Sequence, residues 1–359
     1  MSRSLETGRL VPDPAPLALR DEQVKSLDRL ERASIVSALD ISRSELLDLF
    51  QVAASLQTNV LRAGAALTGK ILLTVFFEPS TRTRLSFESA AHRLGGSVVS
   101  VPDAHFTGVH KGESLADTGV MFSSYADVVV LRHSSERSVE EIRAGLDVPL
   151  INGGNGCDEH PTQAMADWYA LLKWRNELGA ANPRPDRRIS LAMLGTPRLM
   201  RSMRSFLLLG TACFPHAVGD LTIVSDALEP LDAGLVAAIE RAGWPYRCTP
   251  LFAEHVSDFD VIYQNALVPV GQRYEVVGST VRVDRTTPMK PDTVILHPLA
   301  RHDELSPSLD DTPHNLYFDQ ANGAVFVRQA LLLALTGRLR GVLRGASRLE
   351  DAPDTRKAG

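Results

Sequence analysis

The sequence predicts an α/β protein built from two Rossmann-like domains, and three observations lead to this expectation. The chain has 359 residues, which is enough for two domains that each bury a core. Residues 71–101 have the pattern of a strand, a polar turn, a helix and a second strand. A further set of alternating strands and helices begins near residue 189, and such alternation is typical of parallel sheets covered by helices.

The composition is ordinary for a globular chain, with 44% hydrophobic and 23% charged residues. The net charge of −5 gives no general attraction to nucleic acid or to an anionic membrane. The three cysteines (Cys157, Cys213 and Cys248) fit neither CxxC nor metal-ligand spacing. No apolar run reaches transmembrane length, and the first residues lack the apolar core of a signal peptide. We therefore expect a cytoplasmic protein without a metal site.

The first half begins with an extension, residues 1–30, that is rich in proline and charge. Ser42 and Glu45 then match a capping box, and apolar residues follow at helical spacing. The unbroken apolar run 71–77 predicts a buried parallel strand. Apolar residues at helical spacing predict the next helix, and residues 97–101 the next strand.

The turn between this strand and its helix holds five polar side chains that suit an anion: Ser80, Thr81, Arg82, Thr83 and Arg84. The unpaired N–H groups and positive dipole end of a helix N-terminus favour negative charge. Hydroxyls add donors, and the planar guanidinium of Arg82 fits two phosphate oxygens. The turn has no glycine, so it is neither a Walker loop nor a dinucleotide fingerprint. We expect an oxyanion site here, and an ordinary N-cap with exposed arginines is the alternative.

Further polar residues follow the next strands. A polar loop (105–113) and a helix (114–125) lead to a strand (127–131) that ends at Arg132, and a short strand (148–152) precedes a glycine-rich loop. His160 and Gln163 then open a helix with Pro161 in its first turn. Because ligands bind at the carboxyl ends of strands in open α/β sheets, we expect the Ser80 turn, Arg132 and His160 to converge. For His160 alone, a packed or capping histidine is the alternative.

The second half starts after a boundary loop at 182–186. Its expected strands and helices are 189–194, 200–209, 221–224, 234–242, 260–263 and 294–296. GxGxxG is missing, so no dinucleotide is inferred. Arg198, Arg201 and Arg204 recur every three residues, which by default indicates a solvated basic helix face. An apolar helix is expected around 324–335, and a charged, frayed tail after residue 345.

Four motifs, in order, resemble those of the aspartate/ornithine carbamoyltransferases: residues 77–84, 111–118, 160–164 and 297–299. The resemblance extends from about residue 40 to 340. The sequence from His297 to Ala300, and residues 317–321 and 326–332, are more similar to the aspartate branch than to the ornithine branch. The resemblance implies transfer of a carbamoyl group from carbamoyl phosphate to an amine, with no cofactor, and suggests the pyrimidine pathway.

The resemblance also implies an organisation. A carbamoyl-phosphate-binding domain would span 31–165 and be completed by a C-terminal helix at 322–344. An amino-acid-binding domain would span 166–321, and 345–359 would be a flexible tail. Helices would join the domains, and the chains would form a homotrimer whose active sites are shared between neighbouring subunits. Whether a regulatory chain binds is left open.

The family's site residues carry over onto matching positions. The phosphate would be held by four residues of the turn: Ser80, Thr81, Arg82 and Thr83. Arg132 would contact the phosphate and the carbamoyl oxygen, His160 would polarise that oxygen, and Gln163 would bind the carbamoyl amide. This agrees with the chemistry, because a transition state that gathers charge on a carbonyl oxygen and a leaving phosphate needs fixed donors and cations.

The remaining roles concern the neighbouring subunit and the acceptor. Lys111 would enter from the adjacent chain, with Thr107 where the family usually has serine. Arg201 would bind the acceptor's α-carboxylate. The carbonyls of Pro298 and Leu299 would accept hydrogen bonds from the amine and the carbamoyl NH₂.

One segment departs from the family. Ala266 and Val268 stand where an arginine and a glutamine grip the side-chain carboxylate of aspartate. Hydrogen bonds to charged groups contribute about 1.5–3 kcal/mol each, so losing both weakens aspartate binding about a hundredfold or more. Four nearby basic residues are possible replacements, although each is by default an exposed loop charge: Arg273, Arg282, Arg285 and Lys290.

Two acceptor classes therefore remain open: aspartate, and an amino acid with a neutral or amino side chain. A non-catalytic subunit acting in a complex is the alternative to an enzyme. Such a subunit would be expected to have lost functional residues, yet the five that matter most are all present: Ser80, Arg82, Lys111, Arg132 and His160.

Overall fold

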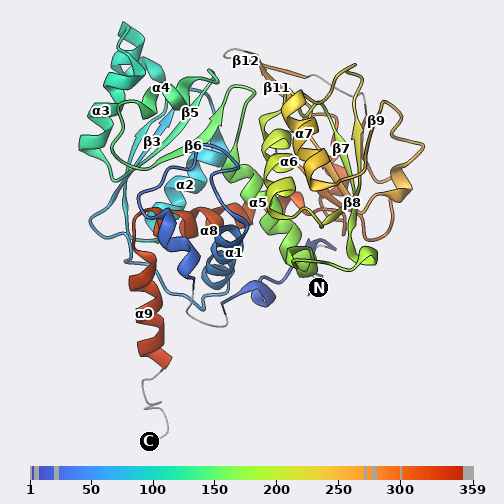
Figure 1. The fold of residues 1–359 in the computed structure, drawn as a ribbon, viewed down its shortest axis with the longest axis horizontal. Coiled ribbons are helices and arrows are strands. Elements are labelled where there is room, and N and C mark those ends of the chain that lie inside the picture. Colours follow the sequence, from blue (N-terminus) through green and yellow to red (C-terminus); the bar gives the residue numbers. More distant parts are fainter. Residues whose placement is uncertain are drawn as a thin grey trace, which may run out of the picture.

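Two parallel sheets lie side by side, each covered by helices (Figure 1). The structure is a computed structural model that describes residues 2–3, 8–19, 24–270, 273–276, 281–299 and 301–350. The first sheet has the strand order β4-β3-β5-β6, and the second has the order β13-β10-β7-β8-β9. The expected α/β fold with two Rossmann-like halves is confirmed.

The first sheet consists of β3 (Ile71–Phe76), β4 (Ser97–Val101), β5 (Val128–His133) and β6 (Leu150–Asn155). Its helices are α2 (Thr81–Arg93), α3 (Leu115–Tyr125) and α4 (Ser138–Arg143). Arg132 lies inside β5 and pairs with Phe76, so it sits beside the turn that follows β3. β6 likewise extends into the segment expected to be a glycine-rich loop, because its backbone continues to pair with β5 as far as Asn155.

Both faces of β3 are buried, as its unbroken apolar sequence predicts. Leu72 and Phe76 belong to the large core under α2 and α8. Leu73 and Val75 pack on the opposite face, in a smaller cluster with residues of α3 and α4. The carboxyl end of the strand is thereby held between two packed layers.

The second sheet consists of β7 (Ile189–Leu194), β8 (Val218–Val224), β9 (Tyr246–Thr249), β10 (Val261–Gln264) and β13 (Val294–Leu296). Its helices are α6 (Arg201–Cys213) and α7 (Ala233–Ala242). The sequence patterns did not indicate β9, nor the hairpin of β11 (Leu267–Val270) and β12 (Arg273–Val276). β9 is an edge strand with mostly exposed side chains, so it carries no apolar run.

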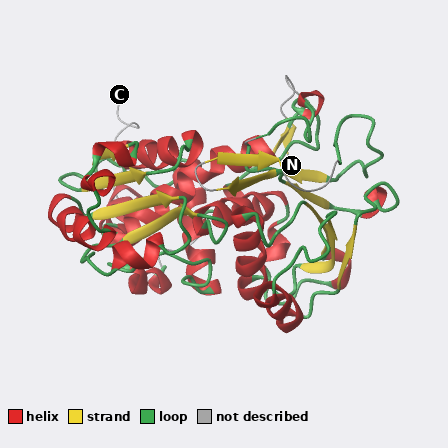
Figure 2. Ribbon diagram, turned by 90° about the horizontal axis from the view of Figure 1, so that it is seen from above, coloured by secondary structure: helices red, strands yellow, loops and turns green. Residues whose placement is uncertain are grey.

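Three helices connect the halves: α1 (Arg43–Gln57), α5 (Pro161–Trp174) and α8 (Tyr317–Leu335). α5 packs against α6 of the second half and against α8, which in turn packs on α1 and α2. Trp168 of α5 stacks on Phe206 of α6 with ring centroids 5.0 Å apart. One hydrophobic core therefore continues from the first sheet to the second. Figure 2 shows the helices that lie between and around the strands of the two halves.

The C-terminal helix expected at 322–344 is two helices. Gly337, at φ 66°, separates α8 from α9 (Leu339–Glu350). α9 continues past residue 345, where a tail is expected, and residues 351–359 lie outside the described part. In the N-terminal extension, β1 (Ser2–Arg3) pairs with β2 (Leu10–Val11), and the Ser42–Glu45 capping box is present. Within the described chain, no helix combines the length and apolar character needed to cross a bilayer.

Candidate active site

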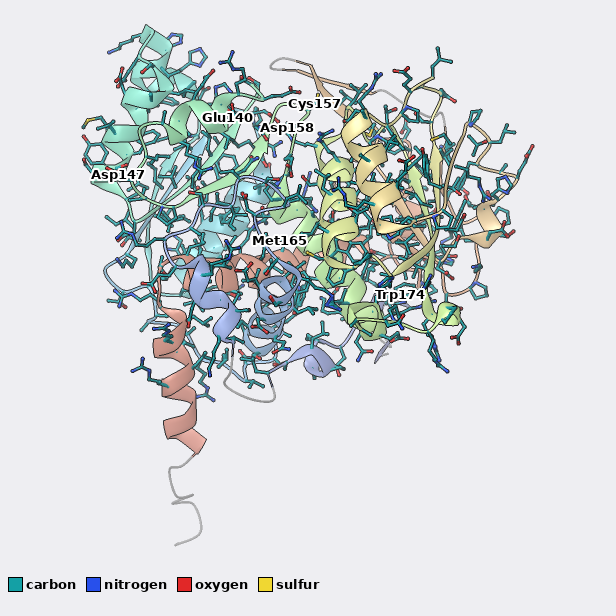
Figure 3. The ribbon with its side chains drawn as sticks, in the orientation of Figure 1. Glu140, Asp147, Cys157, Asp158, Met165 and Trp174 are labelled. Atoms are coloured by element: carbon teal, nitrogen blue, oxygen red, sulfur yellow. The ribbon has the colours of Figure 1, made fainter. Side chains whose placement is uncertain are left out.

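A cavity of about 380 Å³ opens where the carboxyl ends of both sheets face each other. It is lined by residues from both halves: Pro79, Ser80, Thr81, Arg82, Thr83, Arg132, His160, Gln163, Arg201, Ser202, Asn265, Pro298 and His302. The expected convergence of the Ser80 turn, Arg132 and His160 is thus found. Figure 3 shows Cys157 and Asp158, on the segment that leads into α5, at the junction between the two halves.

The N-terminus of α2 forms one wall of the cavity. Ser80 occupies the N-cap position, but its hydroxyl makes no capping hydrogen bond, so the ordinary N-cap alternative does not describe it. Arg82 donates from Nε to the carbonyl oxygen of Pro298 at 3.1 Å, across the gap between the halves. Helix N–H groups, hydroxyls and a guanidinium in one wall make a site for a tetrahedral oxyanion.

Glu78 links two buried arginines of the cavity, Arg132 and Arg201. It is 2% exposed, and its Oε1 accepts hydrogen bonds from Arg132 Nη2 at 2.8 Å and Arg201 Nη2 at 2.5 Å. Its Oε2 accepts from Arg201 Nη1 at 3.0 Å. Burial, together with the neighbouring Arg201 charge, lowers the pKa of Arg132 to about 9, although Glu78 acts in the opposite direction. This carboxylate is therefore the counter-ion of both cations.

Arg201 is not part of a solvated basic face. It begins α6 and is 7% exposed, whereas Arg198 of the same triplet pairs with Glu229 near the surface. Arg201 also donates to the carbonyl oxygen of Gly156 at 2.7 Å. The default interpretation of the triplet is wrong for Arg201, because α6 turns this position toward the first half of the chain.

His160 lies at the N-terminus of α5 and is 5% exposed. Its Nε2 is 3.2 Å from Thr83 Oγ1, and its backbone N–H donates to Ser205 Oγ at 2.9 Å. Burial holds the pKa of His160 well below its ordinary value, and the charges of Arg132 and Arg201 act in the same direction. A neutral imidazole still has one N–H group, and this group can donate a hydrogen bond to a developing oxyanion.

Gln163 lies one turn further along α5. Its Nε2 donates to Asp167 Oδ1 at 2.7 Å. Asp167 is fully buried and was not singled out in the sequence, although its spacing of four residues from Gln163 places both on one helix face. Glu78 was also missed, despite lying inside the first motif.

The segment after β13 closes the cavity from the second half. Pro298 lines the cavity, while the side chain of Leu299 is not among the lining residues. Leu299 has φ 61°, and its N–H donates to His297 Nδ1 at 2.9 Å. The left-handed backbone at Leu299 turns the chain sharply beside the cavity.

Lys111 and Thr107 do not reach this cavity. They lie in the 105–113 segment, where 3-10 turns span Ala104–Phe106 and Gly108–Lys111. Thr107 Oγ1 instead donates to the carbonyl oxygen of Ala104 at 2.8 Å.

The wall that the second half contributes, where the resemblance places the acceptor, differs from the expectation. Ala266 and Val268 are 6% and 4% exposed and do not line the cavity, and Val268 packs in the main core. Among the possible replacements, three have partners elsewhere: Arg282 with Asp284, Arg285 with Asp311, and Lys290 with Asp260. The side chain of Arg273 lies outside the described part. Ser202, Asn265 and His302, none of which the motifs indicated, occupy this side.

Comparisons with known proteins agree with this geometry. The profile of the aspartate/ornithine carbamoyltransferase carbamoyl-P binding domain matches residues 33–173, and that of the Asp/Orn binding domain matches residues 223–335. The aspartate carbamoyltransferase catalytic subunit of Methanothermobacter thermautotrophicus is 34% identical, over 86% of this chain and 97% of the relative. That of Methanopyrus kandleri is 36% identical, over 84% and 97%.

The solved structures give the same result. Aspartate transcarbamoylase of Trypanosoma cruzi, in complex with carbamoyl phosphate and aspartate, has a TM-score of 0.74 and 32% identity. The likeness covers 86% of this chain and 98% of the other. The chain therefore belongs to the aspartate/ornithine carbamoyltransferase family, and its class of reaction is carbamoyl transfer.

Proposed function

We propose that the protein transfers the carbamoyl group of carbamoyl phosphate to the amino group of an amino acid and releases phosphate. The observation that carries the proposal is one cavity that holds a group for each part of the reaction: the α2 N-terminus and Arg82, Arg132, His160, Gln163 and Arg201. The intact set gives no support to a non-catalytic subunit.

In the proposed reaction, the phosphate binds at the α2 N-terminus, with Ser80, Thr81, Arg82 and Thr83. Arg132 and His160 donate to the carbamoyl oxygen, which gains negative charge when the amine attacks the carbonyl carbon. Collapse of the tetrahedral species breaks the bond between carbon and the phosphate oxygen, and the leaving phosphate takes the proton that the amine loses. The carbonyl oxygen of Pro298, joined by that of Leu299, accepts from the amine and the carbamoyl NH₂.

The acceptor's α-carboxylate would pair with Arg201, which Glu78 already holds in position at the cavity wall. We propose aspartate as the first acceptor, because the similar structure from Trypanosoma cruzi is a complex with aspartate. A short amino acid with a neutral or amino side chain is the second candidate. It is favoured by the uncharged Ser202 and Asn265, which line the acceptor side of the cavity, and by the sequence, which has Ala266 at the position of the family's arginine.

We also propose a homotrimer in which the 105–113 segment of one chain completes the cavity of its neighbour. Lys111 is exposed and outside its own chain's cavity, as such an exchange requires. Large apolar side chains are exposed on the same half: Leu85, Val99, Phe106, Val120, Met121 and Tyr125. Such exposed apolar surface is typical of an interface.

The division into a carbamoyl-phosphate domain (31–165, with the C-terminal helices) and an acceptor domain (166–321) is part of this proposal. The packing of α8 on α1 and α2 supports it. A cytoplasmic location is also proposed, since Cys213 and Cys248 are free thiols and the cysteines of the chain show no disulfide-type spacing.

The test is phosphate release from carbamoyl phosphate by the purified protein, with L-aspartate, L-asparagine and L-2,3-diaminopropionate as acceptors. Saturation by aspartate would identify the first candidate, and turnover only with asparagine or the diamine would move the enzyme to another pathway. Arg82→Ala should reduce the rate by at least about a hundredfold, because charged hydrogen bonds to the phosphate are lost. Arg198→Ala, a surface arginine outside the cavity, is the matched control and should leave the rate unchanged. No release with any acceptor would refute the proposal.

A further inference from the structure

Asp167 is a buried carboxylate that the reaction outlined above does not use. It is fully buried on α5, and three neutral side chains donate to it. Its Oδ1 accepts from Gln163 Nε2 at 2.7 Å and from Gln320 Nε2 at 2.5 Å, and its Oδ2 accepts from the Tyr263 hydroxyl at 2.9 Å. The donors come from α5, α8 and β10, so one carboxylate joins three elements around the cavity.

The chemistry of a carboxylate determines how both amides point. An ionised carboxylate only accepts hydrogen bonds, so the NH₂ groups of Gln163 and Gln320 must face Asp167. Their carbonyl oxygens must therefore point away from it. For Gln320, that oxygen accepts from the backbone N–H of His297 at 3.0 Å. Gln163 lines the cavity, and its carbonyl oxygen is left to serve a ligand there.

These two amides support the part of the cavity that needs acceptors. A carbamoyl group differs from an acetyl group by its NH₂, which has two N–H donors to satisfy. Gln163 Oε1 is one acceptor, and the carbonyl oxygen of Pro298, the residue after the one held by Gln320, is another. If Gln163 rotated by half a turn about its last bond, its NH₂ would face the NH₂ of the substrate, and a hydrogen bond would become a repulsion.

We propose that Asp167 is a positioning residue that makes the cavity select carbamoyl phosphate over acyl phosphates. It does so by fixing the amide direction of Gln163 and, through Gln320, the segment from His297 to Leu299. The proposal rests on the proposed function. In this proposal Asp167 contacts no substrate, yet it determines how well the cavity distinguishes an NH₂ group from a CH₃ group.

The burial of Asp167 supports a specific role. Burial raises its pKa to about 7, although the three donors act to lower it. A buried carboxylate is therefore an unfavourable choice for packing alone, since an apolar residue of similar size avoids that desolvation. A protonated Asp167 still presents a carbonyl oxygen to the two amides if its proton lies on Oδ2, which faces the Tyr263 oxygen.

The test compares carbamoyl phosphate with acetyl phosphate, which has the same phosphate and carbonyl groups but a methyl group for the NH₂. The KM for carbamoyl phosphate and the competitive inhibition constant of acetyl phosphate are measured in each variant. In Asp167→Leu, the KM for carbamoyl phosphate should rise about tenfold, the equivalent of one hydrogen bond. The inhibition constant of acetyl phosphate should change less than about twofold. The selectivity is expressed as the ratio of the acetyl phosphate inhibition constant to the KM for carbamoyl phosphate. Asp167→Asn keeps an oxygen for the two amides, so it should retain most of the wild-type ratio.

Tyr263→Phe is the matched control. It removes the donor to Oδ2 and leaves the amide contacts to Oδ1, so its ratio should equal that of the wild type. A folded Asp167→Leu with the wild-type ratio would overturn the proposal. If that variant does not fold, Gln320→Met tests the second contact, and an unchanged ratio there would be equally decisive. Wild-type protein that releases no phosphate with any acceptor would refute the function itself, which keeps the two failures distinct.

Discussion

Replacing Glu78 by glutamine tests the electrostatic core of the site. The carboxylate accepts three hydrogen bonds from Arg132 and Arg201, at 2.8, 2.5 and 3.0 Å, while it is 2% exposed. Glutamine keeps the shape, but its NH₂ must face a guanidinium N–H, and both cations lose their shared counter-ion. Removing one partner of a buried ion pair destabilises a protein by about 3–5 kcal/mol, and we expect about 3 kcal/mol here because the cavity admits water.

The kinetic consequence follows from the pKa of Arg132. Burial already lowers this pKa to about 9, and the Glu78 charge acts to raise it. Glu78→Gln therefore lowers it further. In the proposed reaction Arg132 binds the substrate as a cation. The alkaline limb of kcat/KM for carbamoyl phosphate should therefore move to lower pH, because kcat/KM reports ionisations of the free enzyme. Bound phosphate supplies the missing negative charge, so it should raise the melting temperature of the variant more than that of the wild type.

The assays are initial rates between pH 6 and about 10 and thermal melting with and without phosphate. Glu88→Gln is the control, because Glu88 contacts Thr74 and Ser100 outside the cavity. Its alkaline limb should match that of the wild type. If Glu78→Gln had the wild-type alkaline limb and no added response to phosphate, Glu78 would not be the counter-ion of the two arginines.

Three further predictions concern separate features. Burial raises the pKa of Asp167 from its ordinary value of 3.8 to about 7, so the folded chain binds this proton more tightly than the unfolded chain. The free energy of unfolding should therefore fall by about 4 kcal/mol as pH rises through that interval, and Asp167→Asn should abolish this decrease in urea titrations. Gly154 has φ 115°, and a Cβ there would lie 3.1 Å from Arg201 Nε, so Gly154→Ala should raise the KM values for both carbamoyl phosphate and the acceptor. Gly69→Ala is the control: Gly69 also has a positive φ, of 77°, but no neighbour within 4 Å, so this variant should lower only the melting temperature. His302→Ala should raise the acceptor KM by about three- to tenfold and leave that of carbamoyl phosphate unchanged; equal changes in both would contradict its place on the acceptor side.

The elements of the fold were largely predictable from local patterns. The apolar run 71–77, the helical spacing after Thr81 and the capping box at Ser42 each depend on residues within a few positions of one another. The strand-end rule also predicted that Arg132 and His160 would lie beside the Ser80 turn. The break at Gly337 and the edge strand β9 were missed, because neither carries a strong period.

The α/β class, the polar turn before α2 and the family could be derived from the amino-acid sequence, because they depend on periodicity and on motifs that are contiguous in the chain. Which charges are buried, and which groups they face, became known from the folded chain. Arg201 changed from a presumed surface charge to a partner of Glu78, and Asp167 became the link between Gln163 and Gln320. The physical reason is that burial and hydrogen-bond partners are set by segments more than a hundred residues apart, whose contact no local pattern records.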